Sequence, residues 1–531
     1  MLRAPALAAP LTSSCKTDRD PLCLTASSLS VWRRSLAAFA LLTNPRKTNR
    51  GRAAGAGELP RVTRFAAFAP RQTDQDPLCL TPSSLPAWRR GLAAFALVVL
   101  SASPEQHLRV LLAARTGAVQ LPSGTIELNS GIALPDGAHD LVISGNSTTL
   151  RCSGAFRGSA VLSCQHCRRI TIRDLSIDGN RAQLEKPLPP PPSGGPTFAS
   201  YFANNGLLFT DTDGITVENV TLRNIAGLAI LASNTHHVKI RHSSVADSGS
   251  NNARGRNNTS GGILIEEGSS DFEVSQCTLR TIRGNGIWTH SRFARNANGV
   301  IAGNTLSEIG RDAIQVGHAT NVRVTGNLGS KIGFPASEID AEALATPVGI
   351  DTSGNVDRSV YEGNHFEEIN GKCIDLDGFH DGAVRDNTCV NHGRPEDYSW
   401  GNFGIVMNNS NPDMESRNIV IEENEISGTK YGGIFVIGTG HKVRGNRLSR
   451  INLTHCPEGA ARFACEFREQ PGMLESGIYL GSLAQRPAPA RGNVVERNIV
   501  KGWRMRTRCV GFAPGVSAAG NTIRGNVCSD E

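Results

Sequence analysis

The chain has few aromatic residues and lacks the patterns that long helices require. Phe, Trp and Tyr make up 5% of its 531 residues. Runs of helix-forming residues with an apolar period of 3.6 are scarce, which argues against a helical or leucine-rich repeat as the main architecture. Glycine, with 56 residues, and asparagine are abundant instead. This composition favours short strands joined by tight turns.

A basic surface for nucleic acid is also missing from most of the chain. The formal net charge is +7, but residues 1–103 hold fourteen Lys and Arg against five Asp and Glu. The remaining residues therefore carry a net charge of −2. A nearly neutral domain lacks the positive field that nucleic-acid binding requires, so we expect no nucleic-acid partner.

No apolar run is long enough to span a bilayer. The apolar residues 92–100 follow Arg89 and Arg90 and precede Ser101, Ala102 and Ser103, which is the pattern of a secretory signal. Residues 17–42 and 73–98 are near copies of each other. We therefore expect a leader at 1–103 with a signal peptide at about 86–103, no integral membrane segment, and export to the periplasm or the extracellular space. An N-terminal anchor or a disordered tail is the alternative.

Ten cysteines follow residue 103, and an even number permits disulfides in an exported chain. We favour the pairs Cys456–Cys465 and Cys509–Cys528. The spacing of Cys164 and Cys167 could suggest a metal site, but no second Cys/His pair of suitable spacing accompanies them. Buried or disulfide-bonded cysteines are the better interpretation.

One short sequence motif, called the phrase below, repeats between residues 207 and 480. A small or polar residue, often Gly, is followed by a branched apolar residue, an outward position and a second apolar residue. The branched residues are Ile263, Ile287, Ile314, Ile350, Ile374, Ile405, Ile434 and Ile478. Asparagine turns recur at Asn219, Asn304, Asn327, Asn364, Asn387, Asn424, Asn446, Asn498 and Asn526. Their smallest steps, 22 or 23 residues, fit three short strands and three turns, so one repeat makes one coil of a solenoid.

An apolar run of helical character at 107–115, followed by a strand near 119–128, suits a cap on the open end of the solenoid. These coils and the cap resemble the right-handed parallel β-helix proteins of the pectate lyase-like superfamily over roughly residues 105–531. The resemblance implies an all-β fold, a right-handed parallel β-helix solenoid with a short N-terminal capping helix, at residues 104–531. It does not define an activity, because this architecture serves pectin and alginate lyases, epimerases, polygalacturonases, phage tailspikes and adhesins.

Two outward columns accompany the core positions. The first contains Leu264, Trp288, Gln315, Asp351, Asp375, Val406, Phe435 and Tyr479, and the second includes Glu266, His290, Ser353, Asp377 and Asn408. Asp351 and Asp375 would stand one coil, about 4.8 Å, apart, with Asp377 on the same strand. Opposed like charges destabilise a sheet. The three aspartates therefore indicate an acid and base pair, a Ca²⁺ site, or side chains that simply diverge into water.

Further side chains near these aspartates are candidates. His380 could act as general base or acid with Asp381 beside it. Lys372 and Arg385 could bind a sugar carboxylate. Trp288, His290, Gln315 and Asn408 complete the expected substrate-binding set, and outward Trp288, Phe435 and Tyr479 could stack on sugar rings.

The long insertions 244–261, 330–347, 391–402 and 449–475 all precede the phrase, so they should project from one edge of one sheet. We expect them to form a wall beside the aspartates and to create a groove that suits a linear polymer.

The motifs of known activities are incomplete. Ile350-Asp-Thr and Asp375-Leu-Asp are only loosely similar to two motifs of polygalacturonases, and the Gly-His-Gly and Arg-Ile-Lys motifs are missing. His380-Asp381 matches half of the Asp-Pro-His-Asp stretch of alginate epimerases. We hypothesise a secreted, monomeric enzyme acting on a polysaccharide as hydrolase, lyase or epimerase. A carbohydrate-binding or purely structural surface protein is the alternative.

Overall fold

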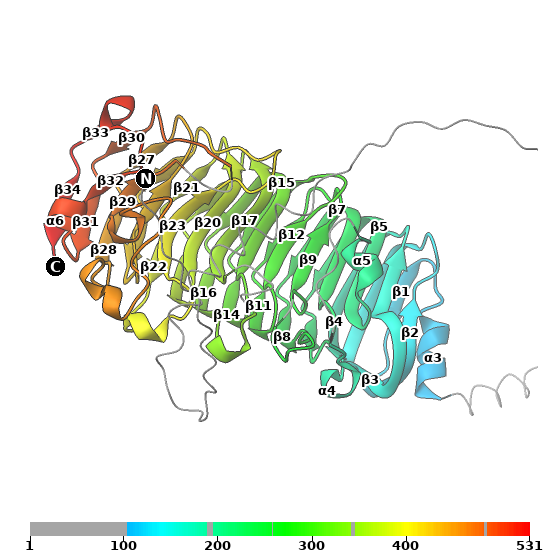
Figure 1. Ribbon diagram of the computed structural model, residues 1–531. Coiled ribbons are helices and arrows are strands. Elements are labelled where there is room, and N and C mark those ends of the chain that lie inside the picture. Colours follow the sequence, from blue (N-terminus) through cyan, green and yellow to red (C-terminus); the bar gives the residue numbers. More distant parts are fainter. Residues whose placement is uncertain (1–102, 188–194, 258, 341–345, 483–485) are drawn as a thin grey trace, which may run out of the picture.

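The computed structural model describes residues 103–187, 195–257, 259–340, 346–482 and 486–531. These residues form a long stack of coils, with the first helix at one end and the C-terminus at the other (Figure 1). The predicted leader and signal peptide lie outside the described residues, apart from Ser103. No helix in the described part of the chain is both long and apolar enough to cross a bilayer.

The first coils are built from long strands. They comprise α3 (Pro104–Leu111), β1 (Gly117–Gln120), β2 (Gly124–Ala133), β3 (His139–Gln165), β4 (Arg168–Asp178), α4 (Arg181–Leu184), α5 (Phe198–Tyr201), β5 (Asn205–Glu218), β6 (Thr221–Arg223) and β7 (Ile230–Arg241). The capping helix α3 begins three residues earlier than expected, with Ser103 as its N-cap in a capping box. Arg109 fixes the helix on β2 by donating to the carbonyl oxygens of Ser130 and Gly131.

Each later coil contributes strands to three faces. The face whose strands carry the repeated motif is called the phrase face. The phrase face contains β9 (Ile263–Glu266), β12 (Ile287–His290), β15 (Ile314–Thr325), β17 (Val348–Asp357), β20 (Lys372–His380), β23 (Phe403–Asn408), β26 (Ile434–Val436), β29 (Ile478–Leu480) and β32 (Val510–Phe512). The second face contains β10 (Glu273–Ser275), β13 (Asn296–Ala302), the end of β15, β18 (Val360–Glu362), β21 (Ala383–Arg385), β24 (Val420–Glu422), β27 (Lys442–Arg444), β30 (Val494–Glu496) and β33 (Thr522–Arg524).

The third face lies between the second face and the next phrase strand. It contains β8 (Ser244–Ser248), β11 (Thr278–Ile282), β14 (Thr305–Ile309), β16 (Leu328–Ile332), β19 (His365–Ile369), β22 (Thr388–Val390), β25 (Glu425–Ser427), β28 (Arg447–Ile451), β31 (Ile499–Gly502) and β34 (Val527–Asp530). Short helical turns interrupt the loops at η2 (Ala336–Glu338), η3 (Pro395–Asp397), η4 (Glu458–Ala461), η5 (Met473–Glu475), α6 (Met505–Arg508) and η6 (Ala518–Gly520).

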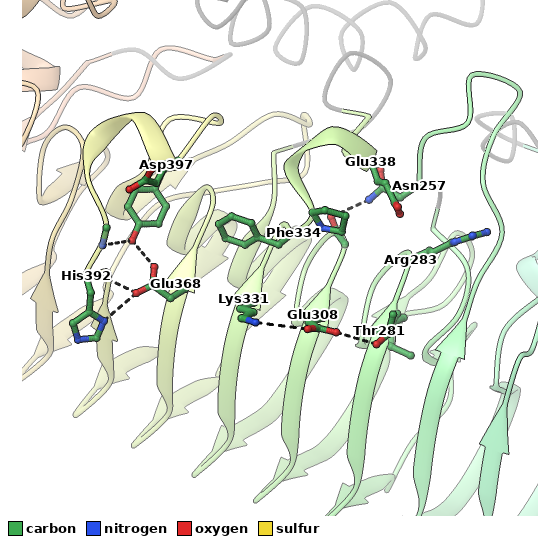
Figure 2. A pocket seen from close by; sticks show the side chains of 15 residues that line it. Asn257, Thr281, Arg283, Glu308, Lys331, Phe334, Glu338, Glu368, His392 and Asp397 are labelled. Atoms are coloured by element: carbon green, nitrogen blue, oxygen red, sulfur yellow. Dashed lines mark hydrogen bonds and ion pairs between the residues drawn. The ribbon is translucent and has the colours of Figure 1, made fainter. Parts of the chain in front are cut away.

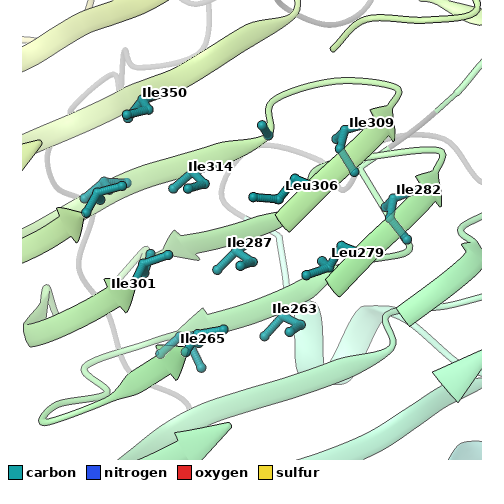
Figure 3. Packing of buried hydrophobic residues seen from close by; sticks show 14 of the residues in the cluster. Ile263, Ile265, Leu279, Ile282, Ile287, Ile301, Leu306, Ile309, Ile314 and Ile350 are labelled. Carbon is teal, nitrogen blue, oxygen red and sulfur yellow. The ribbon is translucent and has the colours of Figure 1, made fainter. Parts of the chain in front are cut away.

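The phrase isoleucines stack as the sequence predicts. Each pairs with the next along the face, from Ile263 with Ile287 through Ile350 with Ile374 to Ile434 with Ile478. Figure 3 shows four of them in line inside the coils. All eight are at most 1% exposed, and burial of such a side chain contributes about 1.5–3 kcal/mol. The register of the whole phrase face follows from this stack.

Buried asparagines form a ladder at the turn between the second and third faces. It contains Asn304, Asn327, Asn364, Asn387, Asn424, Asn446, Asn498 and Asn526. The Nδ2 of Asn364 donates to Oδ1 of Asn387 at 2.8 Å and to the carbonyl of Val324 at 2.9 Å. The assignment of Asn219 to this ladder was wrong. Val220 stands at the ladder position, and Asn219 instead contacts Asp174 on the surface.

Removing a rung from the middle of this ladder is expected to destabilise the fold. Asn364→Ala leaves two ladder partners and a buried carbonyl without their hydrogen bonds, at a cost of about 1–3 kcal/mol. Asn526→Ala is the matched control, because Asn526 lies at the end of the ladder and is less buried. Urea unfolding should show the larger loss for Asn364→Ala, and equal losses would contradict a cooperative ladder.

Disulfides brace both the insertions and the C-terminus. The two predicted pairs, Cys456–Cys465 and Cys509–Cys528, are confirmed. Cys164 bonds to Cys167, so this pair forms a disulfide rather than a metal site, and Cys373 on β20 bonds to Cys389 on β22. Cys152 and Cys277 are buried thiols.

The insertions before the phrase pack against one another as a wall. Arg254 in the first pairs with Asp340 in the second at 2.6 Å. Lys430 donates to the carbonyl of Tyr398 in the third insertion at 3.0 Å, and Arg462 in the fourth pairs with Glu396. Contacts therefore join the first insertion to the second and the third insertion to the fourth.

Candidate functional site

The three predicted aspartates lie where the phrase register places them. Asp351 on β17 pairs with Asp375 on β20, and Asp377 pairs with Ser353 and with Asn408. Their side chains are directed away from the core, because the isoleucines at the alternate positions of the same strands fill the core. Asp351 and Asp375 do not diverge into water, the third of the alternatives considered above, since they are only 7% and 6% exposed.

Each aspartate has a different partner. Gln315, itself held by Asn285 at 2.9 Å, donates to Oδ2 of Asp351 at 2.7 Å. Lys372 forms an ion pair with Asp375. The backbone N–H of Ser410 donates to Asp377 at 2.8 Å, and the Ser410 hydroxyl donates to its second oxygen. The loop that follows β23 therefore covers Asp377.

A fourth carboxylate, Asp312, completes the group and was missed in the sequence. It is 1% exposed, and neither oxygen has a hydrogen-bond partner of ordinary geometry among the described residues. It immediately precedes the phrase residues Ala313 and Ile314, at a position that alternation along a strand does not describe. The equivalent position varies among the other coils, with Gly261, Asn285, Val348, Lys372, Phe403, Gly432 and Ser476, so the sequence carries no clear signal for Asp312. We call Asp312, Asp351, Asp375 and Asp377 the acid cluster.

Burial and mutual repulsion favour the protonated forms in the acid cluster. Burial, with the Asp375 charge nearby, raises the pKa of Asp377 to about 6. Burial also raises the pKa of Asp312 to about 6, and it raises that of Asp351 well above its usual value, helped by the neighbouring Asp312 and Asp375. Burial alone would lower the pKa of Lys372, but the Asp375 carboxylate raises it. Lys372 therefore stays charged.

The fold itself does not require these carboxylates. Apart from Gln315, the other residues of the first outward column are apolar or aromatic: Leu264, Trp288, Val406, Phe435 and Tyr479. A buried ionic group adds little stability over an apolar one, so its restriction to three adjacent coils points to chemistry rather than packing.

The raised pKa of Asp312 predicts a pH-dependent loss of stability. Between about pH 4 and pH 6 the folded chain keeps a proton that the unfolded chain has released, so stability falls as pH rises through this window. Asp312→Asn should reduce that slope, to which Asp351 and Asp377 also contribute, and stabilise the protein by about 1–3 kcal/mol at neutral pH. Urea unfolding at about pH 4 and about pH 7.5 measures the difference.

Asp357→Asn is the control of opposite sign. Burial alone would raise the pKa of Asp357, but hydrogen bonds from Thr320 and Arg295 keep it below its usual value. Its stabilising contribution is present above the unfolded pKa and is lost in acid, so Asp357→Asn should destabilise the protein at neutral pH only. A parallel pH response of the two variants would contradict our assignment of Asp312.

Other predicted residues lie apart from the acid cluster. His380 is buried, with Nδ1 3.2 Å from the carbonyl oxygen of Gly378. Asp381 forms an ion pair with Arg417 at 2.7 Å, and Arg385 on the second face pairs with Glu362 at 2.9 Å. Within the described part of the chain, no hydrogen bond or ion pair joins these residues to the acid cluster.

The outward aromatic residues are covered instead of exposed. Helix α5 packs on the column, and Phe198 meets the Trp288 ring edge-on at 5.0 Å between centroids. Phe435 and Tyr479 stack at 6.1 Å, and Tyr479 donates to the carbonyl of Pro471. The prediction that they offer open platforms was wrong, because docking of distant segments is not visible in the local pattern.

A possible cation site lies outside the acid cluster. The ligand atoms of Glu266, Glu267 and His290 lie within 4.8 Å of one another, whereas the three stacked aspartates form no such group in the described residues. Both glutamates already accept backbone N–H groups, Glu266 from α5 and Glu267 from Arg292 and Phe293. The two glutamates therefore act as anchors: Glu266 fixes α5, and Glu267 fixes the segment at Arg292 and Phe293, by accepting their backbone N–H groups.

The wall borders a groove on its other side, over the third face. This groove has a volume of about 760 Å³ and lies between strand ends of the third face and the insertions (Figure 2). None of the stacked aspartates lines it. The expectation that the wall makes a groove beside the aspartates is therefore not met by this cavity, and the acid cluster is a separate, covered site.

The comparison with family models identifies the architecture. A model described as the right-handed β-helix region matches residues 160–334 and 346–448, more than half of the chain. The chain belongs to this family. The match confirms the predicted right-handed β-helix, and the strands of successive coils pair in parallel as expected. No curated protein matches the chain significantly.

Solved structures show the same fold at low identity. A surface adhesin of Streptococcus pneumoniae, PfbA, is 15% identical with a TM-score of 0.48, over 66% of this chain and 89% of the adhesin. The A-module of a mannuronan C-5 epimerase from Azotobacter vinelandii is 12% identical with a TM-score of 0.45, over 81% of this chain and 96% of the module. The ORF18 protein of Geobacillus virus E2 is 14% identical with a TM-score of 0.40, over 52% of this chain and only 50% of the viral protein. Such distant likenesses do not transfer an activity to the chain.

Proposed function

We propose that this right-handed β-helix protein is an exported, monomeric enzyme that cleaves a neutral polysaccharide by acid–base catalysis in the acid cluster. The observation that carries the proposal is the grouping of four carboxylates, three of them buried, around Lys372 on three adjacent coils, where most other residues of the first outward column are apolar. In this proposal residues 104–531 are the catalytic domain, and residues 1–103 are the leader.

The environments of the carboxylates divide the roles. Asp351 faces a neutral amide and other acids, so it holds a proton and can donate it to a leaving oxygen. Asp375 forms an ion pair with Lys372, and its carboxylate is the proposed nucleophile or base. Both members of this ion pair keep some access to solvent, since the side chains of Lys372 and Asp375 are 14% and 9% exposed.

The net charge favours a neutral substrate. Four carboxylates outnumber the two nearby cations, Lys372 and Arg311, and this excess of acidic groups would repel the carboxylate of a uronic acid. A glycoside hydrolase therefore fits the site better than a lyase or epimerase. Asp351 and Asp375 stand one coil apart, about 4.8 Å, and carboxyl groups at about 5–5.5 Å are typical of retaining hydrolases.

Four disulfides in the described residues support an oxidising compartment and hence export. Together with the predicted signal peptide they make a secreted polysaccharide-active enzyme the coherent interpretation. The long axis of the coils suits a linear polymer.

A panel of neutral and acidic polysaccharides tests the proposal. New reducing ends from neutral polymers, without unsaturated products, are the expected result. Ultraviolet absorbance of unsaturated uronates would indicate a lyase, and an altered uronate composition by NMR would indicate an epimerase. Retention on a polymer without any product would overturn the enzyme and leave a carbohydrate-binding protein.

A further inference from the structure

The groove over the third face has a floor of evenly spaced polar side chains. Thr281, Glu308, Lys331 and Glu368 occupy the position before the last residue of β11, β14, β16 and β19. Each has a left-handed backbone, with φ of 54–55°, which adds an outward position before a buried isoleucine. Because those isoleucines pair from coil to coil, the four side chains lie in one line that spans three coil steps, about 14 Å.

Hydrogen bonds and an ion pair place the floor residues in two separate groups. Thr281 donates to Glu308 at 3.1 Å, and Lys331 lies 3.7 Å from the other oxygen of Glu308. Glu368 accepts from the backbone and the ring of His392, both at 3.0 Å, and from the hydroxyl of Tyr398. Figure 2 shows Phe334 from the overhanging insertion between these two groups. The side chains are therefore already ordered before a ligand arrives, which lowers the entropic cost of binding.

The walls combine one partly exposed aromatic ring with many hydrogen-bonding groups. Phe334 is half-buried, and Pro335 beside it is exposed. The charged side chains of the lining, apart from His392, are Arg283, Lys331, Glu308, Glu338, Glu368 and Asp397. Four carboxylates outnumber two cations, so an acidic polymer is disfavoured. Hydroxyl-rich chains satisfy such donors and acceptors while one sugar ring packs on the aromatic face.

We propose that this groove is a second binding site, separate from the acid cluster, that holds an extended segment of a neutral polysaccharide along the coil axis. The inference rests on the proposed function for the identity of the polymer. It goes further by assigning Phe334 and the polar floor the task of retaining the chain while cleavage occurs elsewhere on the molecule.

Affinity electrophoresis of the full chain carrying Asp375→Asn, in gels containing α-1,3-glucan, β-1,4-glucan, xylan or polygalacturonate, tests the site. Phe334→Ala should weaken retention by a neutral polymer roughly three- to tenfold, the loss of one aromatic contact. Phe293→Ala is the matched control, because Phe293 is 79% exposed and lies outside the groove. Lys331→Ala, at an exposed floor position, provides a second variant that should fold normally and weaken retention less.

The outcomes separate this inference from the proposed function. Equal retention of Phe334→Ala, Lys331→Ala and Phe293→Ala, retention by polygalacturonate alone, or occupation of the groove by a protein instead of a glycan would overturn the second site. The acid cluster would still stand if Asp375→Asn abolished cleavage. Conversely, weakened retention by Phe334→Ala with cleavage unaffected by Asp375→Asn would support the groove and remove the proposed catalytic centre.

Discussion

Asp375→Asn is expected to lower kcat on a neutral polysaccharide by about 10²- to 10⁴-fold while leaving the fold intact. Asn is isosteric with Asp but cannot attack the sugar or accept a proton as a carboxylate does. The Lys372 ion pair would also be lost, so the kinetic measurement must be accompanied by circular dichroism and a thermal transition. Asp386→Asn, an exposed aspartate on the turn after β21, is the matched control and should retain full activity.

The partner variant Asp351→Asn distinguishes the two roles. If Asp351 donates a proton to the leaving oxygen, its loss should be severe for polymers and mild for aryl glycosides, whose phenolate leaves without protonation. For Asp375→Asn the loss should be similar for both substrates, because the attacking group is missing. Unchanged activity in Asp375→Asn, or an identical leaving-group dependence in both variants, would remove the acid cluster as catalytic centre.

The fold followed from the sequence because one local rule repeats in every coil. Apolar residues at alternate positions must face a shared core, so Ile350 and Ile374 could be stacked without coordinates, and Asp351 and Asp375 followed one residue later. The prediction for Asn219 was wrong because its neighbour Val220 occupies the turn position. A turn motif alone does not resolve this shift of one residue.

The surroundings of the site did not follow from the sequence. Burial of Trp288 depends on the docking of α5, and the partial covering of Asp377 depends on Ser410, which lies on the loop after the next phrase strand. Asp312 belongs to a turn, where strand periodicity has no meaning. Tertiary docking and turn geometry therefore decide which outward residues become a site, while the period decides only where the columns run.

Lys372→Met should destabilise the folded chain by about 3–5 kcal/mol near pH 7.5. Removal of this ammonium leaves the buried carboxylate of Asp375 without its ion-pair partner, and an uncompensated buried charge is far more costly than the intact pair is favourable. The denaturant midpoint from urea unfolding measures the loss. Lys331→Met is the control, since Lys331 is exposed and its 3.7 Å pair with Glu308 should be worth less than about 1 kcal/mol.

The pH dependence of this loss connects stability with the proposed chemistry. Burial raises the pKa of Asp312 and Asp377 to about 6, so acidification protonates the cluster and removes the repulsion that Lys372 offsets. The deficit of Lys372→Met should therefore shrink as the pH falls from about 7.5 to about 5. A deficit that is constant over this range would mean that Lys372 contributes packing alone. In that case the carboxylates would not share the coupled protonation on which an acid and a base in one cluster depend.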